Sequence, residues 1–355
     1  MPALYITSTA TFSGKSALCV GLLKRLQRDG FCAGYMKPVS AGARLTDSLL
    51  DEDAVYFKQA FVLPDALEDM VPVGITHQVV QEAMCGVASS DFPARLMTAY
   101  GRIAQGRDVV LLEGGCNLRE GTLIGLPPAK VADLLGAREL VVIRYIDDLQ
   151  VLDDALVAKE RLGATFVGAV VNAVARQQMP FLQEMVKPAL ESRGVAVLAI
   201  LPHERLLQSI SVGELVEFLS GEILCCRDKT EELVEHLMVG AMGVDSALSF
   251  FRRKPNKAVI TGGDRSDIQL AALETSTKCL ILTGDLRPSP IIQARAEEVG
   301  VPMILVRHDT MAAVEIVERY FGKTRFHQEK KVERFEEMLA DRFDFDRLYV
   351  TLGLK

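Results

Sequence analysis

Residues 8–16 read Ser8-Thr9-Ala10-Thr11-Phe12-Ser13-Gly14-Lys15-Ser16, and this stretch decides the fold. It follows a short apolar run, residues 3–6, and opens a helical pattern over residues 16–26. A strand, a loop ending in Gly-Lys-Ser and a helix together form the arrangement that holds a nucleotide's phosphates. Backbone N–H groups and the helix dipole both face the anion in such a loop. The sequence therefore predicts a phosphate-binding loop, hereafter the P-loop (residues 8–16).

The residue types in the P-loop have separate expected roles. Gly14 lets the backbone approach the phosphates, Lys15 reaches the terminal phosphates, and the Ser16 hydroxyl holds Mg²⁺. The first glycine of the usual pattern would fall at Thr9, or at Ser8 if the loop is one residue longer. An ordinary strand-to-helix turn that contains Gly-Lys-Ser is the alternative interpretation. The predicted nucleotide-binding residues of the loop are Thr11, Ser13, Gly14, Lys15 and Ser16.

Length and composition limit the protein classes that fit. A chain of 355 residues suggests two domains, and 49% hydrophobic with 25% charged residues indicates a globular fold. The net charge of −7 gives no electrostatic reason to expect nucleic acid or an anionic membrane as partner. No apolar run reaches the ~18–20 residues of a membrane span. The seven cysteines are scattered without metal spacing, so we expect a cytoplasmic protein.

Apolar strand patterns alternate with helices through the first two hundred residues. This alternation predicts a parallel sheet covered on both faces, in a first domain of residues 1–203. After the P-loop, the expected strands are 31–36, 108–113, 139–145, 166–172 and 195–201. The expected helices are 53–60, 128–135, 149–162 and 181–192.

A second block, residues 204–322, predicts a smaller parallel α/β domain. We expect helices over 212–219, 230–237, 246–251, 266–273, 291–299 and 312–320. The expected strands are 223–225, 258–261, 279–282 and 303–306. In the tail, residues 323–355, apolar side chains recur at helical spacing. They predict one amphipathic helix, docked on the body or on a second copy of it. These side chains are Val332, Phe335, Met338, Leu339 and Phe343.

Three charged residues stand where they could complete a nucleotide site. Lys37 precedes Pro38, which excludes the helical region for Lys37 and places it at a strand end. Ligands bind at the carboxyl ends of strands in open α/β sheets. Asp53 begins a helical pattern and Glu113 ends a strand pattern, so both could hold Mg²⁺ together with Ser16. Lys15 and Lys37 are the catalytic candidates, because such groups neutralise charge in phosphoryl transfer.

Asn172 follows a buried strand pattern over residues 167–171. Its amide could hydrogen-bond the edge of a base, which makes it a candidate for nucleotide binding. An equally simple alternative is that Asn172 caps the turn that follows the strand.

The order of these motifs resembles dethiobiotin synthetase and the related cobyrinic acid a,c-diamide synthetase group over residues 1–203. The resemblance implies that Lys37 binds substrate and the transferred phosphate. It also implies that Ser16, Asp53 and Glu113 bind Mg²⁺ and that Asn172 reads adenine. Its motifs are Ser8–Ser16, Tyr35-Met36-Lys37-Pro38-Val39-Ser40, Asp53, Glu113-Gly114-Gly115, Asn172 and Leu201-Pro202. This chain departs from the family at Ala10, where an acid or amide is usual, and at Cys116-Asn117.

The second block carries Val259-Ile260-Thr261-Gly262-Gly263-Asp264-Arg265-Ser266-Asp267, followed by Leu282-Thr283-Gly284. This pattern resembles the DRTGG domain. The pair of domains is similar to the N-terminal regulatory part of long bacterial phosphotransacetylases, without their acetyl-transfer domain. The resemblance implies a homodimer formed through the DRTGG domain. Gly262-Gly263 could expose N–H groups to an anion, or Asp264 could simply cap the next helix.

Three hypotheses for function follow from these patterns. The first is a regulatory protein that binds ATP and Mg²⁺ and has at most weak ATPase activity. The second is an ATP-dependent ligase or synthetase that activates a small carboxylate or carbamate. The third is a structural dimer with a vestigial nucleotide site, since the P-loop lacks its first glycine.

Overall fold

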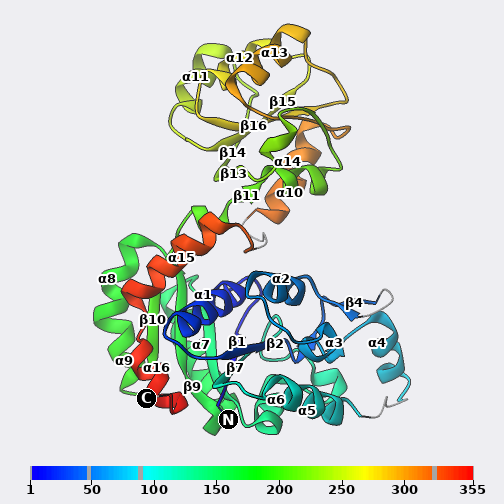
Figure 1. Ribbon diagram of the computed structural model, residues 1–355. Coiled ribbons are helices and arrows are strands. Elements are labelled where there is room, and N and C mark those ends of the chain that lie inside the picture. Colours follow the sequence, from blue (N-terminus) through cyan, green and yellow to red (C-terminus); the bar gives the residue numbers. More distant parts are fainter. Residues whose placement is uncertain (1, 46–48, 87–90, 322–325, 355) are drawn as a thin grey trace. The chain divides into compact units, whose positions relative to one another are not determined.

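The computed structural model of the protein describes residues 2–45, 49–86, 91–321 and 326–354 (Figure 1). The chain divides into two compact units. The first unit comprises Met1–His203 and Val332–Lys355, and the second comprises Glu204–Lys331. The expected boundary between residues 322 and 323 lies outside the described residues.

The first unit is built on a six-stranded sheet in the order β10-β9-β8-β1-β7-β2, with neighbouring strands parallel. Every residue of β1 and β7 is buried, which explains why both read as uninterrupted apolar runs. The strands are β1 (Ala3–Ser8), β2 (Ala33–Met36), β7 (Val109–Glu113), β8 (Arg138–Arg144), β9 (Phe166–Val174) and β10 (Val197–Pro202). Two short ladders pair β3 (Val39–Ser40) with β6 (Val73–Gly74) and β4 (Arg44–Leu45) with β5 (Leu49–Leu50).

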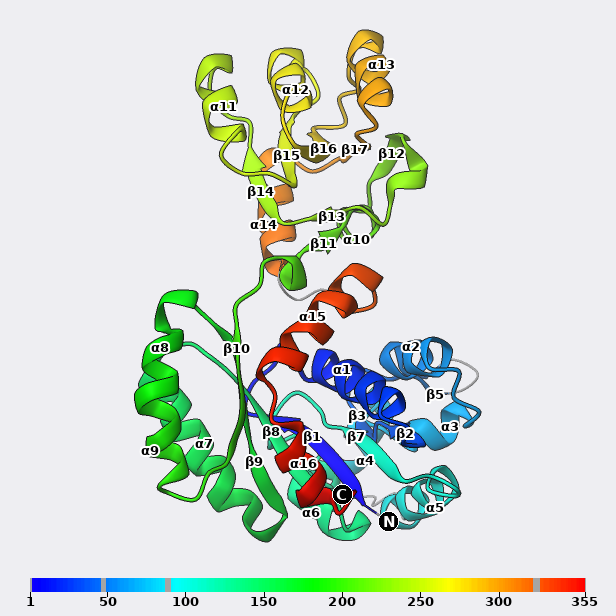
Figure 2. The same ribbon diagram turned by 60° about the vertical axis from the view of Figure 1, so that its left-hand side comes forward.

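Helices cover both faces of this sheet (Figures 1 and 2). The helix expected over 181–192 is a continuous run that contains a π-helical turn, η4. The helices are α1 (Lys15–Arg28), α2 (Glu52–Ala60), α3 (Leu67–Met70), α4 (His77–Met84), α5 (Phe92–Ile103), α6 (Pro128–Leu135), α7 (Asp148–Leu162), α8 (Met179–Phe181), η4 (Leu182–Val186) and α9 (Lys187–Glu191).

The strand order reverses at the middle of the sheet. The chain moves from β1 to β2 and back to β7 on one side, and then to β8, β9 and β10 on the other. Such a switch point leaves a crevice at the carboxyl ends of the strands. The P-loop follows β1, Lys37 follows β2, and Glu113 is the last residue of β7. All three therefore lie at this edge of the sheet.

The C-terminal segment forms two helices instead of the single one expected, α15 (Glu329–Arg342) and α16 (Phe345–Leu352). The Asp344 carboxylate accepts from the Arg347 N–H and begins α16 at the break. From residue 332 the segment docks on the first unit of its own chain. The segment buries the five apolar side chains that recur at helical spacing, Val332, Phe335, Met338, Leu339 and Phe343.

The second unit is a five-stranded sheet in the order β12-β17-β16-β15-β14. Strands β15, β16 and β17 are parallel as expected, and β14, which was not expected, runs parallel to β15. The expected strand over 223–225 forms β12, which runs antiparallel to β17. The helix expected over 230–237 is wrong, because this segment forms β13 and the start of β14. The strands are β11 (Ile210–Ser211), β12 (Glu222–Cys225), β13 (Leu233–Val234), β14 (His236–Val239), β15 (Lys257–Gly262), β16 (Thr277–Thr283) and β17 (Met303–Leu305).

Two apolar clusters form the core of the second unit. One lies between the sheet and α11, α12 and α13, and the other between the sheet and α10 and α14 (Figure 2). The helices are α10 (Val212–Leu219), α11 (Val244–Phe251), α12 (Ser266–Leu273), α13 (Pro290–Val299) and α14 (Thr310–Tyr320). Among the described residues of both units, no helix has the length and apolarity needed to cross a membrane.

Candidate functional site

The P-loop is shaped by hydroxyl side chains as well as by glycine. The Ser8 hydroxyl donates to Ala10 O (2.9 Å), and the Thr9 hydroxyl donates to Asp154 Oδ2 on α7 (2.8 Å). The loop residues with a left-handed backbone are Phe12 (φ 53°) and Gly14 (φ 96°). Neither Ser8 nor Thr9 has a left-handed backbone. The backbone therefore does not require glycine at either position, where the usual pattern has its first glycine.

Gly14 is required by both conformation and space. It is the N-cap of α1, and a Cβ atom there would lie 2.3 Å from Asn172 Nδ2. The Asn172 amide donates to Ser13 O (2.8 Å), and its oxygen accepts from the Ala173 N–H (2.8 Å). Asn172 therefore packs on the P-loop from the carboxyl end of β9. Its contact with a base stays a prediction.

Lys15 carries a buried ammonium group at the start of α1. Its Nζ donates to the Ser8 hydroxyl at 2.9 Å. Within the described part of the chain Lys15 forms no ion pair, and burial lowers the pKa of Lys15 although the Glu113 charge acts in the opposite direction. A buried cation with a neutral partner is poorly compensated. An anion placed beside Lys15 would therefore compensate its charge more directly than the Ser8 hydroxyl does.

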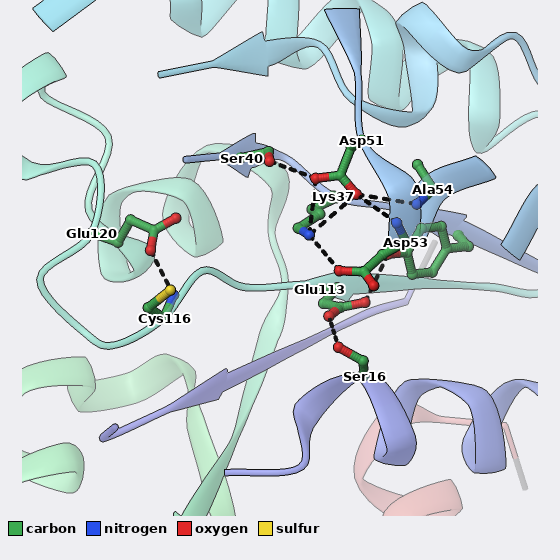
Figure 3. Close-up of polar contacts among 10 residues, drawn as sticks. Ser16, Lys37, Ser40, Asp51, Asp53, Ala54, Glu113, Cys116 and Glu120 are labelled. Atoms are coloured by element: carbon green, nitrogen blue, oxygen red, sulfur yellow. Dashed lines mark hydrogen bonds and ion pairs between the residues drawn. The ribbon is translucent and has the colours of Figure 1, made fainter. Parts of the chain in front are cut away.

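Glu113 is held at the end of β7 by two hydroxyl groups (Figure 3). The Ser16 hydroxyl donates to Oε1 (2.6 Å), and the Tyr35 hydroxyl donates to Oε2 (2.7 Å). Tyr35 is itself stacked on Phe57, with ring centroids 3.7 Å apart. Burial raises the pKa of Glu113, and the nearby Asp53 charge adds to this effect. These contacts hold Glu113 Oε1 against the Ser16 hydroxyl at the start of α1.

Lys37 lies beside two carboxylates, those of Asp51 and Asp53 (Figure 3). Its Nζ lies 2.7 Å from Asp53 Oδ2 and 3.0 Å from Asp51 Oδ2. Burial alone would lower the pKa of Lys37, but the surrounding carboxylates, Glu113 first, raise it above its usual value. Lys37, Asp51 and Asp53 therefore form one ion-paired cluster, on which the Glu113 charge also acts.

A further carboxylate lies on the loop that follows β7. Glu120 Oε2 accepts from the Cys116 N–H at 2.6 Å. A Cβ atom at Gly115 would lie only 2.0 Å from this carboxylate, so a side chain there would have to displace Glu120 from its present position. Figure 3 shows Glu120 and Cys116 to the left of Lys37 and its two carboxylates.

The donor set fits a magnesium ion bound together with a nucleotide. Among the described residues, no group of three or more His, Cys, Asp or Glu side chains could hold a metal ion by itself. A nucleotide-bound Mg²⁺ needs only one or two carboxylates, because phosphates and waters complete its shell. Ser16, Asp53 and Glu113 supply such oxygens. The Ser13 hydroxyl, which is buried without a partner in the described structure, is a further group that a ligand could satisfy.

The structure brings most of the predicted site residues together. Ser13, Gly14 and Asn172 are in contact, as are Ser16 with Glu113 and Lys37 with Asp53. Thr11 lies exposed in the P-loop. Their roles toward a ligand remain predictions.

Sequence reasoning missed several residues that shape this site. Asp51 was recognisable, because it lies two residues before the expected helix over 53–60 and aspartate is a typical N-cap. Tyr35 lies within a quoted motif but without a role. The bond of Thr9 to Asp154 joins the P-loop to α7, 145 positions away, and no local pattern predicts it. The bond of Cys116 to Glu120 lies within one loop, which carried no motif that assigns Glu120 a role.

Comparison with known proteins matches two parts of the chain to family models. A sequence model of the AAA domain matches residues 2–211, more than half of the chain. The chain belongs to the AAA domain family. A model of the DRTGG domain matches residues 214–320. The expected P-loop domain followed by a DRTGG domain is therefore confirmed. Within the DRTGG region, no side chain caps α12, so the alternative that Asp264 caps this helix is wrong.

Curated relatives of this AAA domain protein fall into two groups. Phosphate acetyltransferase from Synechocystis sp. is 26% identical over 331 residues, which cover 88% of this chain and 47% of the relative. The chain spans about half the length of the phosphate acetyltransferases it matches. ATP-dependent dethiobiotin synthetase BioD from Aromatoleum aromaticum is 27% identical over 206 residues, which cover 57% of this chain and 90% of the relative.

Among solved structures, the MinD cell division protein of Aquifex aeolicus aligns with 57–58% of this AAA domain chain and with 83–84% of its own chain. In the complex with MinC, the identity is 12% and the TM-score is 0.38.

Proposed function

We propose that the first unit binds a nucleoside triphosphate, expected to be ATP, together with Mg²⁺, and that the chain is a regulatory nucleotide-binding protein. The observation that carries the proposal is the Lys15 ammonium, which is buried at a helix start beside a neutral hydroxyl. A phosphate group would supply the missing counter-charge. Loop N–H groups and the α1 dipole would add to its attraction.

The other residues at the edge of the sheet have roles in the same proposal. Ser16, Asp53 and Glu113 would hold Mg²⁺, which screens the negative charge of the phosphates. Lys37 would face the terminal phosphate from the opposite side of the crevice. Asn172 is proposed to contact the base from its position beside the P-loop.

The regulatory part of the proposal rests on the pairing of the AAA domain with a DRTGG domain. Because this chain aligns with about half the length of the related phosphate acetyltransferases, we propose that it corresponds to their regulatory part. The nucleotide state of the first unit would then be passed to the DRTGG domain or to a partner, and a homodimer through the DRTGG domain is part of this proposal.

Calorimetry with ATP and Mg²⁺ tests the proposed binding. We expect the wild-type protein to bind with a Kd of about 100 μM or tighter, which is about −5.5 kcal/mol or more favourable. Lys15→Ala should weaken binding at least tenfold, because a charge-assisted contact to phosphate is lost. Lys24→Ala is the matched control, since Lys24 lies on α1 and pairs with Glu336 at the surface.

Two results would contradict the proposal. The absence of binding heat from the wild-type protein would leave the hypothesis of a structural dimer with a vestigial site. An unchanged affinity in the Lys15→Ala variant, with circular dichroism showing an intact fold, would remove the P-loop from the binding site.

A second candidate function is an ATP-dependent synthetase that activates a small carboxylate or carbamate. The match to dethiobiotin synthetase BioD, which covers 90% of that relative, favours it. Phosphate release from ATP should then rise sharply with one member of a panel of small carboxylates and carbamates, and Lys37→Met should abolish the rise. A slow release that no compound stimulates would favour the regulatory function.

A further inference from the structure

Asp51 is fixed more firmly than any other carboxylate around Lys37. It is the N-cap of α2, and its Oδ1 accepts from the N–H groups of Asp53 (3.0 Å) and Ala54 (3.2 Å). Its Oδ2 accepts from the buried Ser40 hydroxyl at 2.6 Å. With its side chain only 3% exposed, Asp51 belongs to the framework of the first unit.

Asp53 contrasts with Asp51 in its surroundings. Both carboxylates contact Lys37 Nζ, Asp53 at 2.7 Å and Asp51 at 3.0 and 3.2 Å. The Asp53 side chain is 33% exposed. Asp53 is also the residue that the proposed function assigns to Mg²⁺. A carboxylate recruited by a divalent cation is no longer a full partner for a neighbouring ammonium group.

We propose that Asp51 is a positioning residue that holds Lys37 against the terminal phosphate once Asp53 binds Mg²⁺. This inference rests on the proposed function. The lysine side chain is long and flexible, so an ammonium group without a fixed partner would lose its place. Because Asp51 is held by Ser40 and the start of α2, its position does not depend on the metal. The site therefore favours a nucleoside triphosphate over a diphosphate through the pair Asp51 and Lys37.

The plain alternative is that Asp51 serves only as the N-cap of α2. Asp51→Asn separates the two roles, because asparagine caps helices as well as aspartate does but carries no charge. A capping role would therefore survive the substitution, and the hold on Lys37 would be weakened.

The test compares two ligands on the full chain by calorimetry with Mg²⁺, the β,γ-imido analogue of ATP and ADP. We expect the wild-type protein to prefer the triphosphate analogue. Asp51→Asn should lower affinity for the analogue about tenfold and leave affinity for ADP unchanged. Lys37→Met should do the same, and the double variant should lose no more than Lys37→Met alone. Glu52→Gln, an exposed neighbour on α2, should change neither affinity.

Each other outcome decides against the inference. An equal loss for both ligands in Asp51→Asn would show a structural role, and additive losses in the double variant would show that Asp51 does not act through Lys37. Equal wild-type affinities for both ligands would overturn the inference and leave the proposed function standing. Absence of binding by the wild-type protein would overturn both.

A second variant protects the test against misfolding of Asp51→Asn. Ser40→Ala removes the hydroxyl that holds Asp51 Oδ2 and leaves every charge in place. It should lower the preference for the triphosphate analogue in the same direction by a smaller factor. An unchanged preference in this variant would also contradict the inference.

Discussion

At the scale of single residues, the P-loop combines one required glycine with several hydroxyl contacts. Ser8 and Thr9 bind the Lys15 ammonium and the Asp154 carboxylate, whereas Gly14 provides the left-handed turn. Asn172 fills the space above Gly14 and donates to the neighbouring Ser13 carbonyl. Conformation and packing therefore both exclude a side chain at position 14.

Gly14→Ala should destabilise the first unit and weaken nucleotide binding at least tenfold. The left-handed backbone costs an alanine about 1–2 kcal/mol, and the new methyl group would also displace the Asn172 amide. Gly30→Ala is the matched control, because Gly30 has a similar φ of 90° and no neighbour within 4 Å of its Cβ position. Urea unfolding and calorimetry measure the two effects. Equal losses of stability and affinity in both variants would show that the contact with Asn172 does not add to the cost of a side chain at position 14.

At the scale of secondary-structure elements, two segments behave differently from their local pattern. The segment 230–237 has apolar residues at helical spacing, yet Leu233 and Val234 pair with β11, and His236 and Leu237 pair with β15. Partner strands distant in sequence supply these hydrogen bonds, so tertiary pairing overrides the local preference. The C-terminal segment keeps its helical pattern but breaks into α15 and α16.

Because α15 packs on α1, shortening an apolar side chain of α15 at this contact should lower the free energy of unfolding. Leu339 is 1% exposed and lies against Gly21, whose Cβ position is 2.4 Å from Leu339 Cδ1. Leu339→Ala should lower the free energy of unfolding by about 2–5 kcal/mol, because it leaves a cavity. Val350→Ala, at an exposed position on α16, is the control and should change it by less than about 0.5 kcal/mol. Urea unfolding followed by circular dichroism would measure both, and equal values would contradict the packing.

At the scale of the whole molecule, each unit has its own sheet and its own core. The candidate site belongs to the first unit alone, where β1, β2 and β7 bring together residues more than ninety positions apart, such as Ser16 and Glu113. The sheet also buries a carboxylate away from this site. Glu139 on β8 is fully buried, accepts from the Thr165 hydroxyl, and has an Oε2 atom without a partner in the described structure.

Glu139 should make the stability of the first unit depend on pH. Burial raises the pKa of Glu139 from 4.5 to about 7, so the folded state binds the proton more tightly than the unfolded state. Stability is therefore greatest below the unfolded pKa and falls as pH rises through the folded pKa. The full loss is about 3 kcal/mol, at 1.36 kcal/mol for each pKa unit. Urea unfolding between pH 4.5 and 8 would measure it.

Glu139→Gln should flatten this decline, because glutamine does not titrate. Glu160→Gln, at an exposed position on α7, is the control and should keep the wild-type decline. A wild-type profile without a decline, or an equal decline in Glu139→Gln, would contradict the assignment.

The amino-acid sequence by itself determined the class of fold, the P-loop and the likeness to a P-loop domain followed by a DRTGG domain, because these depend on local periodicity and on short motifs. It also placed Lys37 and Glu113 at strand ends, since Pro38 and the Gly-Gly turn are local signals. Only the tertiary structure decided that Asp51 pairs with Lys37, that Tyr35 and Ser16 share Glu113, and that the C-terminal helices cover α1. Those contacts join segments that are distant in sequence, and the pairing of strands and the packing of side chains have no signature in a single stretch of chain.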